Sequence, residues 1–132
     1  MNIKPLLDAW SPRLLSVLRI VVALLYIEHG TSKFFGVPQS MGTIRLFSLM
    51  GAAGVLEIGG SILLFFGLFT RPVAFILSGQ MAFAYFLAHA PHSPYPLVNH
   101  GEAAVFYCFV FLYFAAAGGG AWSLDKIIRH RE

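Results

Sequence analysis

Residues 26–33 read Tyr26-Ile-Glu-His-Gly-Thr-Ser-Lys33 and place a carboxylate, an imidazole and an ammonium at the end of a long apolar run. In the preceding residues 14–27, only Ser16, Arg19 and the hydroxyl of Tyr26 interrupt the hydrocarbon. Glu28 and His29 therefore fall where such a run would leave the membrane. This pattern predicts a polar site at the edge of a membrane.

The composition of the whole chain supports a membrane protein. Of its 132 residues, 58% are hydrophobic and only 11% are charged, whereas soluble proteins carry about a quarter charged residues. This length predicts a single transmembrane domain, residues 1–132, with about four spans of roughly 20 residues each. The net charge of +3 comes from scattered Lys and Arg residues, so we predict no binding to nucleic acid.

The predicted fold is all-α, an integral membrane antiparallel four-helix bundle. Breaks rich in Gly and Pro separate the apolar runs, and no signal-peptide cleavage site follows the first run. Ser11-Pro12 is typical of a helix start, and Arg19 lies near enough to that start to snorkel to the interface or to fix helix register. The predicted spans are residues 12–30, 50–69, 72–90 and 101–117, followed by a short interfacial tail over residues 122–132, which Ser123 would cap.

The distribution of Lys and Arg predicts the orientation of the bundle. With a cytoplasmic N-terminus, six of these residues face the cytoplasm and two face outward, which favours an N-in, C-in topology. The loop at residues 91–100 then faces outward without any Lys or Arg. The cytoplasmic set is Lys4, Arg13, Arg71, Lys126, Arg129 and Arg131, and the outward set is Lys33 and Arg45.

This topology places several ionisable side chains in the outer half of the bundle. Glu57 is the strongest candidate, because placing a charged side chain near the bilayer centre costs about 2.5–3.5 kcal/mol. Glu57 also lies on a helix face of small residues, which a neighbouring helix can approach closely. A purely structural reading, in which Glu57 only fixes helix register, stays open. The candidates for ligand binding or proton handling are Glu57, His29, His89, Glu102, Asn99, Glu28 and Tyr85.

Some of these candidates also have local structural explanations. Asn99 and Glu102 have the spacing of a capping box for the last span, and Tyr85 and His89 could pair at the end of the third span. The histidines show no H-x-x-x-H or H-E-x-x-H spacing, so no metal site is predicted. The lone Cys108 excludes an intrachain disulfide. No catalytic or cofactor-binding residue can be assigned from these patterns.

Several motifs taken together resemble the DoxX family of small four-helix bacterial membrane proteins over nearly the whole chain. His100 stands where that family usually has Gly, and Gly119 where it usually has Pro. The matching motifs are His29-Gly30, Lys33-Phe-Phe-Gly36, Gly54-Val-Leu-Glu-Ile-Gly-Gly60, Gly67-Leu-Phe-Thr-Arg-Pro-Val-Ala74, Gln80-Met-Ala-Phe-Ala-Tyr85, Asn99-His-Gly-Glu102 and Gly118-Gly-Gly-Ala-Trp-Ser-Leu-Asp125. The resemblance implies a multi-pass protein of the bacterial inner membrane and, for some members, association with quinone-linked thiosulfate oxidation or thiol-oxidative-stress complexes.

These observations favour the membrane subunit of an oxidoreductase or oxidative-stress system, with an outer-half polar pocket for a quinone-type or other small ligand. Glu57, His29 and His89 would handle protons, while Asn99 and Glu102 would shape the rim. We expect no cofactor held by this chain apart from a bound quinone. Expected partners are the lipid bilayer, soluble or membrane oxidoreductase subunits, and further copies of the chain. Two alternatives remain: a small proton-coupled permease, and a structural membrane anchor that recruits soluble enzymes.

Overall fold

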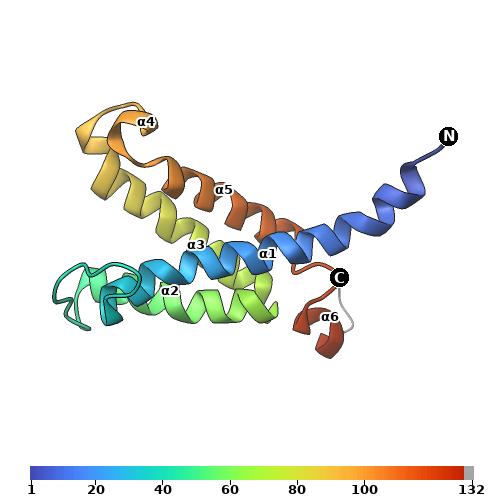
Figure 1. The fold of residues 1–132 in the computed structure, drawn as a ribbon, viewed down its shortest axis with the longest axis horizontal. Coiled ribbons are helices and arrows are strands. Elements are labelled where there is room, and N and C mark those ends of the chain that lie inside the picture. The colour runs from blue at the N-terminus through green and yellow to red at the C-terminus, as the bar shows by residue number, and fades with distance from the viewer. Residues whose placement is uncertain (130–132) are drawn as a thin grey trace.

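The computed structural model of the chain describes residues 1–129, and all regular structure in this region is helical (Figure 1). By length and composition, α1, α2 and the continuous helical stretch Thr70–His92 could each cross a membrane, and α5 is a shorter apolar helix. The last part of the predicted tail, including Arg131, lies outside the described residues. The elements are α1 (Lys4–Phe35), α2 (Leu49–Phe66), α3 (Thr70–Ala84) with a π turn (Tyr85–His89) and a 3-10 turn (Ala90–His92), α4 (Pro96–Asn99), α5 (Glu102–Ala117) and α6 (Leu124–Arg129).

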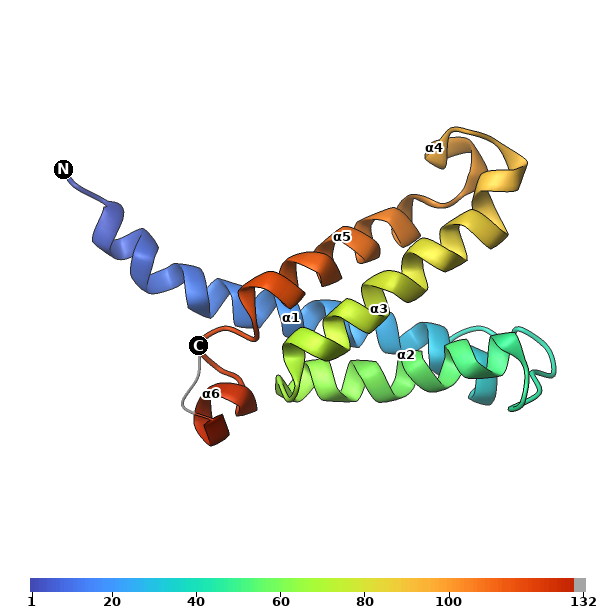
Figure 2. The same ribbon diagram turned by 180° about the vertical axis from the view of Figure 1, so that it is seen from behind.

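The long helices are arranged as two pairs. α1 lies along α2, and α3 lies along α5 (Figures 1 and 2). The pairs meet near α6, which we call the closed end, defined by residues 118–129. They spread apart toward the loop at residues 36–48 and α4, which we call the open end. The core where the pairs meet contains side chains from all four helices, including Tyr26, Leu64, Leu77, Phe111 and Phe114.

α1 is longer at both ends than the sequence indicates. The predicted start at Ser11-Pro12 is wrong, because the helix begins at Lys4 and Pro12 lies inside it. The start is set by Pro5 in the first turn, where proline costs no hydrogen bond, and by Asn2, whose side chain accepts from the amide of Lys4 at 3.0 Å. Residues 1–11 are exposed, so the carbonyl that Pro12 leaves unbonded is not trapped in the core.

Arg19 does not snorkel to the interface. Its side chain is fully buried, and its guanidinium donates to the carbonyl of Gly119 at 2.9 Å, to that of Trp122 at 2.6 Å, and to the carbonyls of Leu64 and Phe65. The last carbonyls of a helix have no partner within the helix, and a planar guanidinium can serve several of them at once. Arg19 therefore joins α1 to the end of α2 and to the segment after α5.

The segment after α5 is built into the closed end. The Asp125 carboxylate accepts from the amides of Phe69 and Thr70, both at 2.8 Å, and so caps the first turn of α3. The amide of Asp125 donates to the Gly67 carbonyl at 2.9 Å. Ser123 Oγ accepts from the Lys126 amide at 3.2 Å, which confirms the predicted cap of the tail helix. The tail is thus an integral part of the closed end.

Replacing Arg19 with Lys tests the role of the buried guanidinium. An ammonium keeps the charge but cannot reach the same set of carbonyls, so we expect the free energy of unfolding to fall by roughly 2–4 kcal/mol. Thermal unfolding in detergent micelles measures the change. Arg45→Lys, at an exposed position, is the control and should leave stability unchanged. A wild-type melting profile for Arg19→Lys would contradict this role.

Candidate functional site

A buried ion pair lies between α1 and α2. Lys33 Nζ donates to both carboxylate oxygens of Glu57, at 2.9 Å to Oε1 and 2.8 Å to Oε2. Glu57 is 3% exposed and Lys33 8%, so Glu57 points into the protein, as the sequence predicts. Lys33 was expected to be an outward topology residue and was not among the candidates. The one sequence feature that places Lys33 near the candidate residues is its position one helical turn after His29.

Gln80 extends this ion pair to α3 and back to α1. Its side-chain amide donates to Glu57 Oε1 and to the carbonyl of Ala53, both at 3.3 Å. The Tyr26 hydroxyl then donates to Gln80 Oε1 at 3.0 Å. Tyr26 is fully buried, and such a buried network is stabilising when its members are satisfied. Side chains from three helices therefore form one chain of polar contacts, from Lys33 through Glu57 and Gln80 to Tyr26.

Tyr26 also connects the polar chain to His29. Its ring centroid lies 5.7 Å from that of His29, 5.0 Å from that of Tyr107 and 4.9 Å from that of Phe111. The His29 and Tyr107 rings meet edge to face at 5.8 Å and 88°, a preferred geometry for aromatic pairs. Within the described residues, neither ring nitrogen of His29 has a hydrogen-bond partner. The polar chain thus holds the Tyr26 ring, which packs with Tyr107 against the His29 imidazole.

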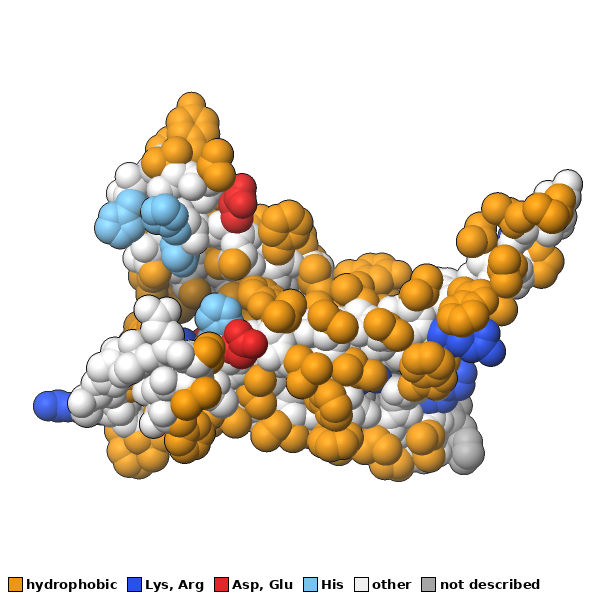
Figure 3. Space-filling model, viewed as in Figure 1, with side chains coloured by type: hydrophobic (Ala, Val, Ile, Leu, Met, Phe, Trp, Pro, Cys, Tyr) orange, Lys and Arg blue, Asp and Glu red, His pale blue; other side chains and the backbone are white. Residues whose placement is uncertain are grey.

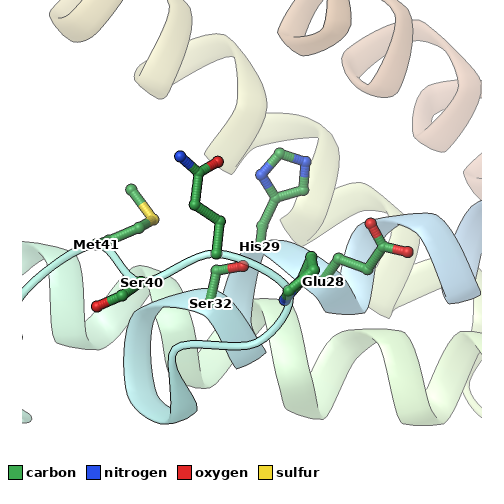
Figure 4. A pocket seen from close by; sticks show the side chains of 7 residues that line it. Glu28, His29, Ser32, Ser40 and Met41 are labelled. Carbon is green, nitrogen blue, oxygen red and sulfur yellow. The ribbon is translucent and has the colours of Figure 1, made fainter.

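His29 also lines a cavity at the open end. The cavity has a volume of about 340 Å³ and is lined by Glu28, His29 and Ser32 of α1 and by residues 38–41 of the following loop. In Figure 4 the side chains of His29 and Met41 project to the same side of this loop, while Glu28 projects away from it. On the face seen in Figure 3, histidine and acidic side chains gather around the hollow between the two helix pairs.

His89, Asn99 and Tyr85 form a separate group on the other helix pair. His89 Nδ1 contacts the carbonyl of Asn99 at 3.0 Å, and the Asn99 side-chain amide donates to the Tyr85 hydroxyl at 3.2 Å and the Ser93 carbonyl at 2.9 Å. Asn99 Oδ1 accepts from the amide of Gly101 at 2.8 Å. These bonds close the connection between α3 and α5, and none of them reaches Glu57 or His29.

The predicted capping box between Asn99 and Glu102 is wrong. The cap residue of α5 is Gly101, with no side-chain capping bond, because Asn99 belongs to the preceding helix α4 and uses its side chain on its own turn. Glu102 is exposed and lies in the first turn of α5, where its negative charge interacts favourably with the positive end of the helix dipole. In residues 1–129, no three His, Cys, Asp or Glu side chains are grouped so as to hold a metal ion.

Comparisons with known proteins place this geometry in context. The family model described as DoxX matches residues 14–90. An uncharacterized protein of Haemophilus influenzae is 48% identical over 127 residues, covering 91% of this chain and 94% of that protein. Inner membrane protein YqjF of Escherichia coli is 28% identical, with 87% and 92% covered, and a Bacillus subtilis protein named putative oxidoreductase CatD is 27% identical, with 85% and 84% covered. No solved structure gives a significant match.

The ion pair predicts a non-additive mutant cycle. Glu57→Gln or Lys33→Met alone leaves one buried charge without its partner, so each should lower the free energy of unfolding by roughly 3–5 kcal/mol. The double variant removes both charges and should recover most of this loss. Chemical unfolding in detergent micelles measures all four proteins, with Glu28→Gln as the exposed-carboxylate control. Losses that simply add in the double variant would show that the two side chains are not coupled.

Proposed function

The chain belongs to the DoxX family of bacterial membrane proteins, and we propose that it is the membrane subunit of an oxidoreductase system that binds a quinone-type ligand at its open end. It is a multi-pass protein of the bacterial inner membrane and contacts the lipid bilayer. The observation that carries the proposal is the His29 ring, which lines the cavity, has no hydrogen-bond partner among residues 1–129, and packs against the rings of Tyr26 and Tyr107.

The cavity has the size that a small ligand needs, and its lining is mostly polar, with Pro38 and Met41 as its apolar side chains. Its volume of about 340 Å³ lies at the lower end of the range for ligand sites, roughly 300–1,000 Å³. In the proposed site, a ring nitrogen of His29 binds an oxygen of the ligand and exchanges a proton with it. Tyr107 lies outside the cavity lining; it is half-buried and supports the imidazole by packing edge to face on the His29 ring. The apolar tail of such a ligand would remain in the bilayer.

Glu57 acts in this proposal through Tyr26 rather than on the ligand. Both of its carboxylate oxygens bind Lys33, and Oε1 also accepts from Gln80. Gln80 in turn binds the Tyr26 hydroxyl, so the carboxylate orients the ring against which His29 packs. We therefore assign proton exchange to His29 and a positioning role to Glu57. His89, with Asn99 and Tyr85, would shape the opposite arm of the open end, and Glu28 and Glu102 would form its charged rim.

The oxidoreductase part of the proposal has its support in the comparisons. One relative carries the name of an oxidoreductase, and this name applies to that relative. We propose that the electron-carrying cofactor lies on a partner subunit. The ligand at His29 would be the mobile carrier that exchanges electrons with that cofactor. The present chain would then supply the membrane side of the reaction: the cavity, the proton-exchanging imidazole and the aromatic rings that pack against it.

We further propose that residues 1–129 form one antiparallel bundle with both chain ends on the cytoplasmic side. The basic residues Arg13, Arg71, Lys126 and Arg129 all belong to α1, α3 or α6 at or near the closed end, and such residues favour the cytoplasm. The open end and its cavity would then face the outside of the membrane.

Cysteine labelling tests this orientation. In a Cys108→Ala background, we expect His92→Cys to react with a membrane-impermeant maleimide added to intact spheroplasts. Lys126→Cys should react only after the membrane is permeabilised. Both positions are exposed, so access is limited by the membrane and not by burial. The reverse labelling pattern would invert the bundle and place the cavity on the cytoplasmic side.

Binding of decylubiquinone to the purified protein tests the ligand site. Replacing His29 with Phe keeps an aromatic ring but removes the hydrogen bond, so we expect binding to weaken by up to about tenfold, the value of one ordinary hydrogen bond. Quenching of intrinsic fluorescence in detergent micelles measures the affinity. His92→Phe, on the exposed loop, is the matched control and should bind as the wild type does. Equal affinity of the His29 variant would exclude the imidazole from the site.

A further inference from the structure

The closed end exposes cations beside apolar side chains. In α6, Lys126 and Arg129 are three residues apart and so lie on neighbouring positions of one helix face. Ile127 and Ile128 stand between these cations in the sequence and project from the other side of the helix; they are 67% and 61% exposed, and Trp122 just before the helix is 54% exposed. A surface that combines exposed large apolar side chains with cations is typical of a contact with another molecule.

α6 is held in a fixed place on the bundle. The Asp125 carboxylate and amide bind the backbone of the α2–α3 turn at Gly67, Phe69 and Thr70. The Arg129 guanidinium lies 4.5 Å above the centre of the Phe69 ring. Because α6 is attached at both its first and last turns, its exposed cations and isoleucines keep a defined position relative to the membrane-spanning helices. They do not depend on a flexible tail.

The same end of α1 adds a second cation with an aromatic neighbour. The Arg13 guanidinium lies 5.5 Å from the centre of the Trp10 ring, and the Pro12 carbonyl accepts from the amide of Ala121, so this turn of α1 adjoins the segment before α6. Within residues 1–129, neither Arg13, Lys126 nor Arg129 has a carboxylate at ion-pair distance. The acids near this end are otherwise engaged, since Asp8 pairs with Lys4 and Asp125 binds backbone amides.

We propose that this surface, formed by Trp10, Arg13, Trp122 and residues 126–129, binds the headgroups of anionic phospholipids in the surrounding bilayer. The cations would meet the phosphodiester groups, while Ile127, Ile128 and the tryptophans enter the upper acyl layer. A lipid surface fits because it offers negative charge and hydrocarbon side by side. A soluble acidic partner would leave the isoleucine pair in water. The proposal goes beyond the quinone site and does not depend on it.

Native mass spectrometry of the intact protein tests this surface. The protein is released from micelles that carry either phosphatidylglycerol or phosphatidylcholine, and bound lipids are counted as a function of lipid concentration. We expect the wild type to prefer phosphatidylglycerol, and the preference to fall about fivefold for each cation removed in Lys126→Gln and Arg129→Gln. Arg45→Gln, an exposed cation at the open end, should keep the wild-type preference.

Two further measurements make the result decisive. Circular dichroism should show the same helical content in all variants, so that a lost preference reports the surface and not unfolding. Millimolar inorganic phosphate should fail to displace bound phosphatidylglycerol, because phosphate lacks the hydrocarbon that the isoleucines contact. Three results would each overturn the proposal: equal binding of the two lipids by the wild type, an unchanged preference in the variant that carries both Lys126→Gln and Arg129→Gln, or displacement by phosphate.

Discussion

The ion pair between Lys33 and Glu57 is the constraint on which the open end depends. Two charges out of water are tolerated only when each has its partner in good geometry, so α1 and α2 must keep the register that joins them. The helix backbones also have to come close. A Cβ atom on Gly30 would lie 2.5 Å from Cγ1 of Ile58, and one on Gly54 would lie 2.6 Å from the Phe34 ring. The glycines in this part of the sequence therefore serve the same contact as the two charges.

The consequences of this contact extend to the candidate site. Gln80 brings α3 to the carboxylate of Glu57, and the Tyr26 hydroxyl is held by Gln80. The Tyr26 ring then packs on His29 and on α5 through Tyr107 and Phe111. One buried charge pair thus orders residues on four helices, and the His29 imidazole lies at the end of this chain of contacts.

The closed end also contains buried charged side chains, but there they are paired with backbone groups. Arg19 is a buried cation whose partners are mainly backbone carbonyls, and Asp125 is a buried carboxylate whose partners are backbone amides. Each stands where a helix end leaves polar backbone groups without partners. The two helix pairs are tied together there and spread apart at the other end (Figures 1 and 2). The open end carries the cavity between α1 and its following loop, and the closed end carries the anchored helix α6.

Much of the helical fold, but only part of the site, follows from local sequence. Apolar runs and Gly or Pro breaks predict the helices, and a face of small residues predicts that Glu57 is buried. The partner of Glu57 was missed because Lys33 is 24 residues away and stands where a topology signal is expected. The burial of Arg19 cannot be predicted from local sequence because its partner carbonyls follow 45 to 103 residues later. The capping box predicted for Asn99 and Glu102 does not form, because Asn99 is the last residue of the short helix α4, which ends just before α5. Such errors arise wherever tertiary contacts override local signals.

The charge state of the Lys33–Glu57 pair is the most direct test of this account. An infrared difference spectrum between the wild type and Glu57→Gln, recorded in lipid bilayers at neutral pH, isolates the vibration of this one carboxyl group. The account predicts that the substitution removes a band of an ionised carboxylate. Loss of a protonated carboxylic acid band instead would mean that Glu57 and Lys33 do not form an ion pair, and that the contacts leading to His29 rest on something else.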